Sequence, residues 1–202
     1  MIRSDKSIIS IALVGELITH KPVLRSGSRV HDLLMATGPL GLSSAGLEIL
    51  ENRREPLNPD EQFLLKRHLY PEPRLKEGTV LGDVDRLATS MLDLSDDLMT
   101  SLEILRRDGG VGFEISLDGI PVHAALRKFC ERGKFPTHRF ILWGGEDYEL
   151  LFTVPSSKAA RVKRKIPRSY VLGRVMPKAF GIKILRNGKR FFPRDLRFKH
   201  FQ

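Results

Sequence analysis

The run Leu150-Leu151-Phe152 constrains the fold most, because three consecutive positions are apolar. Side chains of a strand point alternately to opposite faces, so such a run needs apolar cover on both sides of a sheet. It closes the stretch LWGGEDYELLF, residues 142–152, in which two glycines and three acidic residues come first. We therefore expect a central strand over 140–154 that the two glycines interrupt.

Hydrophobic periodicity and turn formers divide the rest of the chain into helices and further strands. Short β-branched runs predict strands, and apolar residues at helical spacing, as at Leu98, Leu102 and Leu105, predict helices. Helices and strands mix without strict alternation, so we expect an α+β domain, a mixed sheet with helices packed on one face. The expected helices are 43–52, 58–69, 83–87, 97–107, 122–132 and 156–165, and the other strands are 7–17, 33–37, 88–92, 113–117, 170–175 and a hairpin over 182–192 that turns at Asn187-Gly188.

Charge is distributed unevenly along the chain. The net charge is +10, yet residues 154–202 contain 15 Lys and Arg against one acid, Asp195, and residues 1–153 sum to −4. Such asymmetry can indicate nucleic-acid binding, but it equally suits a phosphate-rich small ligand or a surface that keeps the protein in solution. Phenylalanines in the tail could stack on bases, although their hairpin placement suits packing at least as well. Nucleic acid is therefore not an expected partner.

Several classes of protein are not indicated. No apolar run approaches the roughly 18 to 20 residues of a membrane helix, so we expect no membrane association. The single cysteine, Cys130, fits a reducing cytoplasm and is expected to pack in a helix. The sequence contains no P-loop, no GxGxxG and no HExxH pattern. Arg25, beside Ser26-Gly27, suits a phosphate, but alone it equally suits a solvated surface position.

A group of acidic residues follows the predicted strand 88–92. If that strand continues to Ser95, then Asp93 and Ser95 share a face, and Asp96 and Asp97 begin the next helix, where free N–H groups favour negative charge. Neighbouring carboxylates repel unless a cation joins them, and Mg²⁺ accepts one or two carboxylates with phosphate oxygens and water. The pattern suits a metal-bridged polyphosphate; the alternative is that these residues only cap the helix.

A second acidic group lies in LWGGEDYELLF. Strand alternation would place Glu146 and Tyr148 on one face and Asp147 and Glu149 on the other. The glycines allow a left-handed backbone or the close approach of a ligand, so the carboxylates would lie at the edge of a cleft. The alternative is a turn with surface acids that balance the basic tail. Glu146 is the residue that we expect to face a substrate, and Asp147 and Glu149 are expected to be structural.

Five stretches together resemble thiamine-monophosphate kinase, a member of the superfamily of aminoimidazole ribonucleotide synthetase and selenophosphate synthetase. The resemblance covers nearly the whole chain, and GGEDYELLF is its most specific part. The five stretches are GGEDYELLFTVP (144–155), SMLDLSDDL (90–98), VLRSGSRVHDLLMATGPLGLSSAGL (23–47), RHLYPEPRL (67–75) and the terminal FKHF (198–201).

The resemblance implies a fold, a reaction and a set of site residues. The fold would be the C-terminal domain of the aminoimidazole ribonucleotide synthetase-like fold. The reaction would transfer the γ-phosphate of ATP to thiamine monophosphate, giving thiamine diphosphate with Mg²⁺, by positioning and charge neutralisation rather than by a protein nucleophile. The implied site residues are Asp93 and Asp96 for Mg²⁺, Arg25 and Ser95 for ATP, and Glu146 and Phe198 for the substrate.

The chain departs from the family pattern in two respects. Asp97 stands where glycine is usual, so that an extra carboxylate would crowd the metal or bind another ion. The family also begins with a further domain, part of a barrel shared across a homodimer, which supplies more metal ligands. Residues 1–29 would then be the last strand of that absent domain plus a linker, and residues 30–202 the C-terminal α+β domain.

Three other functions are kept open beside the kinase. The chain could be a noncatalytic nucleotide- or metabolite-binding module, or a partner subunit of a separately encoded first domain. It could also be another ATP-using member of the same superfamily. Binding of nucleic acid through residues 154–202 is the third hypothesis, and steep salt dependence would mark it.

Overall fold

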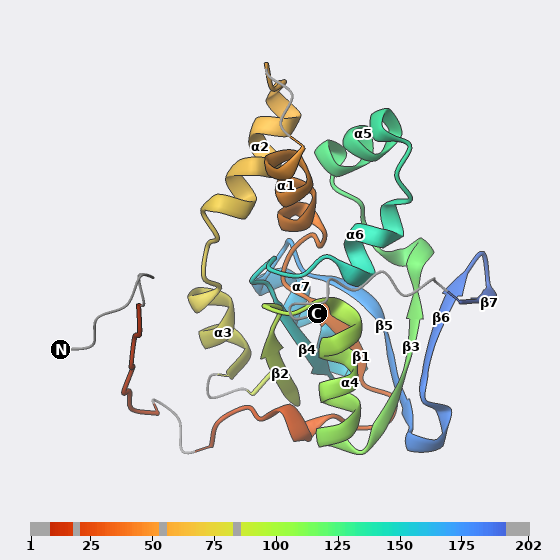
Figure 1. The fold of residues 1–202 in the computed structure, drawn as a ribbon. Coiled ribbons are helices and arrows are strands. Elements are labelled where there is room, and N and C mark those ends of the chain that lie inside the picture. The colour runs from red at the N-terminus through yellow and green to blue at the C-terminus, as the bar shows by residue number, and fades with distance from the viewer. Residues whose placement is uncertain (1–8, 18–20, 53–55, 83–85, 193–202) are drawn as a thin grey trace.

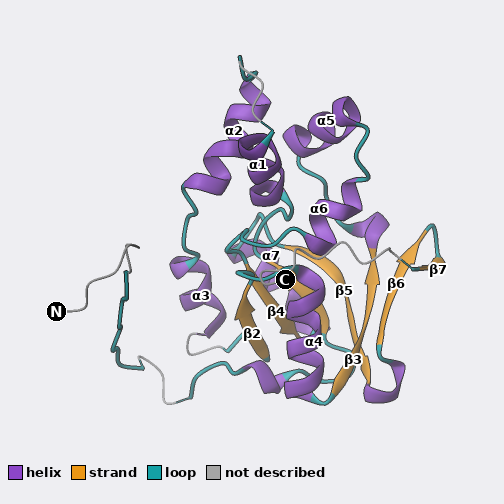
Figure 2. Cartoon of the chain, in the orientation of Figure 1, coloured by secondary structure: helices purple, strands orange, loops and turns teal. Residues whose placement is uncertain are grey.

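A seven-stranded sheet organises the described chain (Figures 1 and 2). The computed structural model describes residues 9–17, 21–52, 56–82 and 86–192. The strand order is β2-β4-β1-β5-β3-β6-β7; all neighbours are antiparallel except β3 and β6, which are parallel. The strands are β1 (Leu33–Ala36), β2 (Ser90–Asp93), β3 (Val111–Ser116), β4 (Leu150–Val154), β5 (Tyr170–Pro177), β6 (Ile182–Arg186) and β7 (Lys189–Phe191).

Seven helices in the described ranges cover this sheet. In Figure 1, α4 and α6 lie in front of the sheet, and α1, α2 and α5 stand beyond its upper end. The helices are α1 (Leu42–Glu51), α2 (Pro59–Leu69), α3 (Leu75–Gly82), α4 (Leu98–Gly109), α5 (Ala124–Gly133), α6 (Thr137–Trp143) and α7 (Ala159–Lys165), with 3-10 turns η1 (Arg25–Gly27), η2 (Leu117–Gly119), η3 (Ser156–Lys158) and η4 (Lys178–Phe180).

The core has two parts, one on each face of the sheet. Along β1, Leu34 and Ala36 join the larger cluster beneath α1, α4, α5 and α6, whereas Met35 joins a smaller cluster with Leu81 of α3 and Val162 of α7. The α+β class and the mixed sheet are thus confirmed. The expectation that helices pack on one face needs correction, because α3 and α7 cover the other face where the central strands are apolar on both sides.

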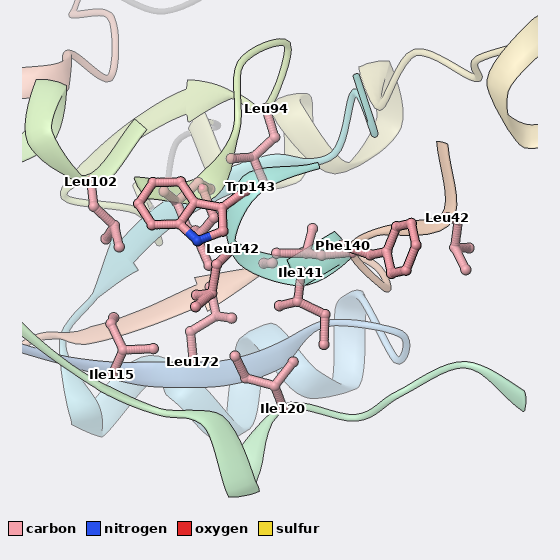
Figure 3. Close-up of a cluster of buried hydrophobic side chains, with 14 of the residues drawn as sticks. Leu42, Leu94, Leu102, Ile115, Ile120, Phe140, Ile141, Leu142, Trp143 and Leu172 are labelled. Atoms are coloured by element: carbon pink, nitrogen blue, oxygen red, sulfur yellow. The ribbon is translucent and has the colours of Figure 1, made fainter. Parts of the chain in front are cut away.

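The expected strand over 140–154 is two elements. Residues 140–143 belong to α6, and only Leu150–Val154 forms a strand, β4, between β1 and β2. Figure 3 shows why four consecutive apolar residues suit a helix here: Phe140 points toward Leu42, while Trp143 lies beside Leu94 and Leu102. All four side chains are buried, because packed elements surround this short helix.

Most other expected elements are present, with shifted ends. The hairpin turns at Asn187-Gly188, both with positive φ, and buried Cys130 packs in the core of α5 as expected. The strand expected at 7–17 is wrong over its described part, since 9–17 forms no strand and lies exposed, away from the sheet (Figure 1). The expected helix at 83–87 is wrong in place: α3 ends at Gly82, and 83–85 lie outside the described residues.

We predict that Leu102→Ala lowers the free energy of unfolding by about 2–5 kcal/mol, because its side chain is fully buried between α4 and the sheet. Urea denaturation measures this loss. Leu75→Ala is the control, since that side chain is 73% exposed and its removal should change stability by less than about 0.5 kcal/mol. Equal losses in the two variants would contradict the assignment of α4 to the core.

Candidate functional site

The end of β2 and the start of β4 meet at one corner of the sheet. Their antiparallel register pairs Asp93 with Leu150, so the residues after β2 run beside the residues before β4. Backbone hydrogen bonds continue beyond the strands: Leu94 N–H donates to the Glu149 carbonyl (2.8 Å), and Glu146 N–H donates to the Ser95 carbonyl (2.9 Å). The two acidic groups of the sequence are therefore one neighbourhood in space.

A cavity of about 350 Å³ opens at this corner. Its walls contain four of the predicted site residues, Arg25, Asp93, Ser95 and Asp96, and the first lies far from the others in sequence. All four are exposed, whereas Leu94 between them is 2% exposed and packs in the core. The structure thus brings a guanidinium, two carboxylates and a hydroxyl to one solvent-accessible surface, a set that suits phosphate groups and a divalent cation.

Arg25 is held at this cavity by the turn η1. The Leu24 carbonyl accepts from Met91 N–H (3.3 Å), which ties the turn to the edge of β2. A Cβ atom on Gly27 would lie 1.8 Å from the Thr89 carbonyl oxygen, so only glycine permits this approach. Ser28 then joins a buried chain of hydroxyl groups through Ser90 (2.7 Å). The turn is consequently packed against the strand that carries Asp93.

Asp97 caps α4 and has both carboxylate oxygens engaged. One accepts from Thr100 N–H (2.8 Å) and the other from the Thr100 hydroxyl (2.9 Å). This side chain does not line the cavity. Of the two interpretations of this acidic group, metal binding or helix capping, Asp97 fits helix capping. The cap is also a structural reason for a carboxylate at a position where the family usually has glycine.

Glu146 does not line this cavity; it lies on a strained loop whose backbone is hydrogen-bonded to Ser95. Its φ is 56° and that of Tyr148 is 50°, left-handed values that side chains rarely adopt, and Gly145 between α6 and Glu146 has φ 78°. The exposed Glu146 carboxylate lies 3.6 Å from Nδ1 of His68, which also contacts the Ser43 hydroxyl (3.0 Å). Predicted site residue Phe198 falls outside the described residues.

Asp147 is a buried cap for helix α1. Its carboxylate accepts three backbone N–H groups, from Gly41 (2.6 Å), Leu42 (3.0 Å) and Ser43 (3.0 Å). Burial raises its pKa to about 6, against the opposing effect of these hydrogen bonds. The structural role expected for Asp147 is therefore present, although the backbone that buries it is a left-handed loop and not the expected strand.

Glu149 is fully buried and neutralised by arginine. Arg74 donates from Nε (2.8 Å) and Nη2 (2.6 Å) to its two carboxylate oxygens, and the Thr37 hydroxyl donates at 2.6 Å. The hydrogen bond to Glu149 raises the pKa of Arg74, so the guanidinium group keeps its positive charge. Arg74 belongs to RHLYPEPRL, and no local pattern in the sequence indicates its contact with GGEDYELLF; the shared resemblance of both stretches to one family was the available signal.

The carboxylates fit a metal shared with phosphate better than a metal held by protein alone. Within the described ranges no group of three or more His, Cys, Asp or Glu side chains could hold a metal ion. Asp93 and Asp96 supply two carboxylates on the cavity wall, and Mg²⁺ typically takes one or two, with phosphate oxygens and water completing its shell.

The described helices include none that is long and apolar enough to cross a membrane.

The fold and this corner define a protein class. Residues 29–183 match the family of AIR synthase related proteins, C-terminal domain, and the chain belongs to that family. Among curated proteins it is similar to thiamine-monophosphate kinase of Aquifex aeolicus, with 38% identity over 157 residues, 77% of this chain and 49% of the relative. It is similar to thiamine-monophosphate kinase of Buchnera aphidicola (subsp. Acyrthosiphon pisum), with 31% identity over 96% of this chain and 60% of the relative.

Solved structures give the same picture. The structure of AaThiL complexed with AMPPCP and TMP matches with a TM-score of 0.71 and 33% identity, covering 85% of this chain and 52% of that chain. The chain thus spans about half the length of the relatives that it matches. The predicted resemblance to the C-terminal part of thiamine-monophosphate kinases is confirmed.

We predict that the stability difference between the native protein and Asp147→Asn depends on pH. The folded-state pKa of Asp147 lies above its usual range, so the folded protein binds the proton more tightly than the unfolded chain. The native protein should therefore gain stability relative to the variant as the pH falls from about 7 to about 4, by up to about 3 kcal/mol. Urea titrations across this range measure it, and a constant difference would contradict the prediction.

We also predict that Asp97→Ala costs about 1 kcal/mol of folding free energy, because Thr100 N–H loses its acceptor at the start of α4. Thermal or urea unfolding measures the loss. Asp108→Ala, on the same helix but in its last turn, removes the same charge without removing a cap and is the control. An unchanged stability for Asp97→Ala would show that this carboxylate is available for another role.

Proposed function

We propose that this chain is the C-terminal part of a thiamine-monophosphate kinase. In the proposed reaction the bond between the γ-phosphorus of ATP and the β–γ bridging oxygen breaks. A new bond forms from that phosphorus to a phosphate oxygen of thiamine monophosphate, so that thiamine diphosphate and ADP leave. Support comes from the names of the similar curated proteins and from a similar structure complexed with AMPPCP and TMP. The whole protein's activity is inferred, because the chain spans about half the length of these relatives.

The observation that carries this proposal is the convergence of Arg25, Asp93, Ser95 and Asp96 on one cavity. Phosphoryl transfer needs in-line positioning and neutralisation of phosphate charge. We assign Arg25 and Ser95 to ATP phosphate oxygens. Asp93 and Asp96 would hold Mg²⁺, which neutralises charge on the phosphates when it is bound.

Glu146 and Phe198 complete the proposed substrate contacts. Glu146 lies exposed on the loop that is hydrogen-bonded to Ser95, so a substrate held there would lie beside the nucleotide. Its left-handed backbone turns the carboxylate outward while Asp147 and Glu149 point inward. Phe198 stays a prediction from the resemblance.

The organisation of the complete enzyme is also part of the proposal. Residues 1–29 would belong to a barrel domain and its linker, and residues 30–202 to the C-terminal domain of a cytoplasmic homodimer. The exposed apolar side chains of Ile9, Ile11, Leu13 and Val14 support this, because an apolar segment with such a surface typically packs against a neighbouring element. A noncatalytic nucleotide-binding module or partner subunit is the alternative.

We predict that Asp93→Asn weakens Mg²⁺-dependent binding of an ATP analogue by at least about tenfold, because a metal-ligating carboxylate is lost. Calorimetric titration with and without Mg²⁺ measures the change. The matched control is Asp108→Asn, which removes the same charge from the exposed end of α4, far along the helix from the cavity.

A second measurement separates the two candidate functions. Release of ADP that depends on thiamine monophosphate supports the kinase assignment. Saturable, Mg²⁺-dependent nucleotide binding without ADP release, in a protein that includes the family's first domain, supports the noncatalytic module, and ADP release only after that domain is added as a separate chain supports the partner subunit. Absence of both, or equal binding by Asp93→Asn and Asp108→Asn, overturns the assignment of this cavity.

A further inference from the structure

A second and larger cavity lies beyond the upper end of the sheet. Its volume is about 950 Å³, and it has no lining residue in common with the cavity at Arg25. It is lined by α2, the segment that leads into α3, the residues just before α5 and the end of α7. The charged residues of its lining are Lys66, Arg67, Arg74, Lys76, Lys165 and Arg168 against Glu72, Glu77 and Glu149.

The positive charge of this cavity is only partly compensated. Glu149 is the fully buried carboxylate of the wall, and Arg74 neutralises it with two hydrogen bonds, so it leaves little charge to repel an anion. In contrast Lys66, Lys165 and Arg168 take part in no ion pair within the described part of the chain. They come from two parts of the chain, Lys66 from α2 and the other two from the end of α7 and the loop after it, and they line one concave surface, which focuses their field.

An aromatic wall stands beside these cations. The rings of Phe63 and His123 stack with centroids 4.7 Å apart and an interplanar angle of 12°. His123 is fixed in place, because its Nδ1 accepts from Ala125 N–H (3.2 Å) at the start of α5. Burial lowers the pKa of His123, and Arg67 and Arg168 lower it further, so the two guanidinium groups act at this wall from different elements.

We propose that this cavity binds a phosphorylated small molecule that carries a flat ring. Lys66, Lys165 and Arg168 bind its phosphate groups, and the ring lies along the stacked pair of Phe63 and His123. The volume is within the range of small-molecule sites, and the combination of cations with an aromatic surface matches both parts of such a ligand. The site is separate from the proposed transfer of phosphate at Arg25, and it does not depend on that proposal.

This assignment also bears on the basic C-terminal segment. Of the cations that residues 154–202 contribute, Lys165 and Arg168 line the cavity, whereas Lys163 and Arg164, which precede Lys165 on α7, do not. The charge asymmetry has three interpretations. This cavity would be the place where one of them, the binding of a phosphate-rich small ligand, applies. Neighbouring cations outside the cavity offer controls of identical charge.

The test is calorimetric titration of the full chain with inorganic pyrophosphate and with ADP, in EDTA so that metal-dependent nucleotide binding is suppressed. Arg168→Ala should weaken binding by about tenfold or more, because a charge-assisted contact to phosphate is lost. Arg164→Ala removes the same charge from outside the cavity and should change affinity less than about twofold. Both side chains are exposed and form no ion pair with the residues that the structure describes, so neither variant is expected to unfold, and urea titration checks this.

The outcomes distinguish the sources of affinity. Tighter binding of ADP than of pyrophosphate, lost in Phe63→Ala, supports the ring contact together with the phosphate contact. Equal affinity for the two probes, or equal effects of Arg168→Ala and Arg164→Ala, overturns the proposal. Binding in EDTA that is lost in Asp93→Asn but kept in Arg168→Ala also overturns it, by placing the anion in the other cavity. Failure of Mg²⁺-dependent binding, with ring-dependent binding of ADP in EDTA retained, contradicts only the proposed kinase site.

Discussion

The pairing of β2 with β4, and its continuation past the ends of both strands, is the constraint on which the candidate site depends. The ladder ends at Asp93 and Leu150, yet the backbone bonds between Leu94 and Glu149 and between Ser95 and Glu146 extend it into two loops. Each hydrogen bond contributes little by itself, typically about 1 kcal/mol. Together they fix which side chains of the two loops face the cavity at Arg25 and which are buried.

The four residues 146–149 show how this constraint divides similar side chains between roles. Left-handed backbone at Glu146 and Tyr148 costs about 1–2 kcal/mol per residue. In return Asp147 caps α1 with three N–H groups and Glu149 binds Arg74, so two carboxylates support the domain from inside. The strain lies at the residue that we assign to a substrate, as is common where a site needs a side chain in a fixed, exposed position.

The same buried pair of Glu149 and Arg74 links the two cavities. Its carboxylate comes from the loop that carries Glu146, while its guanidinium lines the larger cavity beyond the sheet. Breaking a buried ion pair leaves an uncompensated charge and typically costs several kcal/mol, so this contact holds α2 and α3 against the sheet. The motifs RHLYPEPRL and GGEDYELLF are thus joined in the fold by a buried ion pair.

Local sequence determined the parts that depend on neighbouring residues alone. Asparagine and glycine at 187 and 188 produced the hairpin, the spacing of Leu98, Leu102 and Leu105 produced the buried face of α4, and a capping box at Asn58 began α2. The alternation at 146–149 predicted the correct division between exposed and buried side chains, although the backbone that produces it is a loop.

Tertiary structure alone decided the rest. Four apolar residues at 140–143 satisfy a strand or a buried helix equally, and the surrounding elements selected the helix α6. No local pattern places Arg25 near Asp93 or Arg74 near Glu149, since those contacts join segments about 70 residues apart and exist only after the sheet has formed. The residue types for phosphate and metal chemistry were evident in the sequence, but strand pairing decided which of them share a cavity.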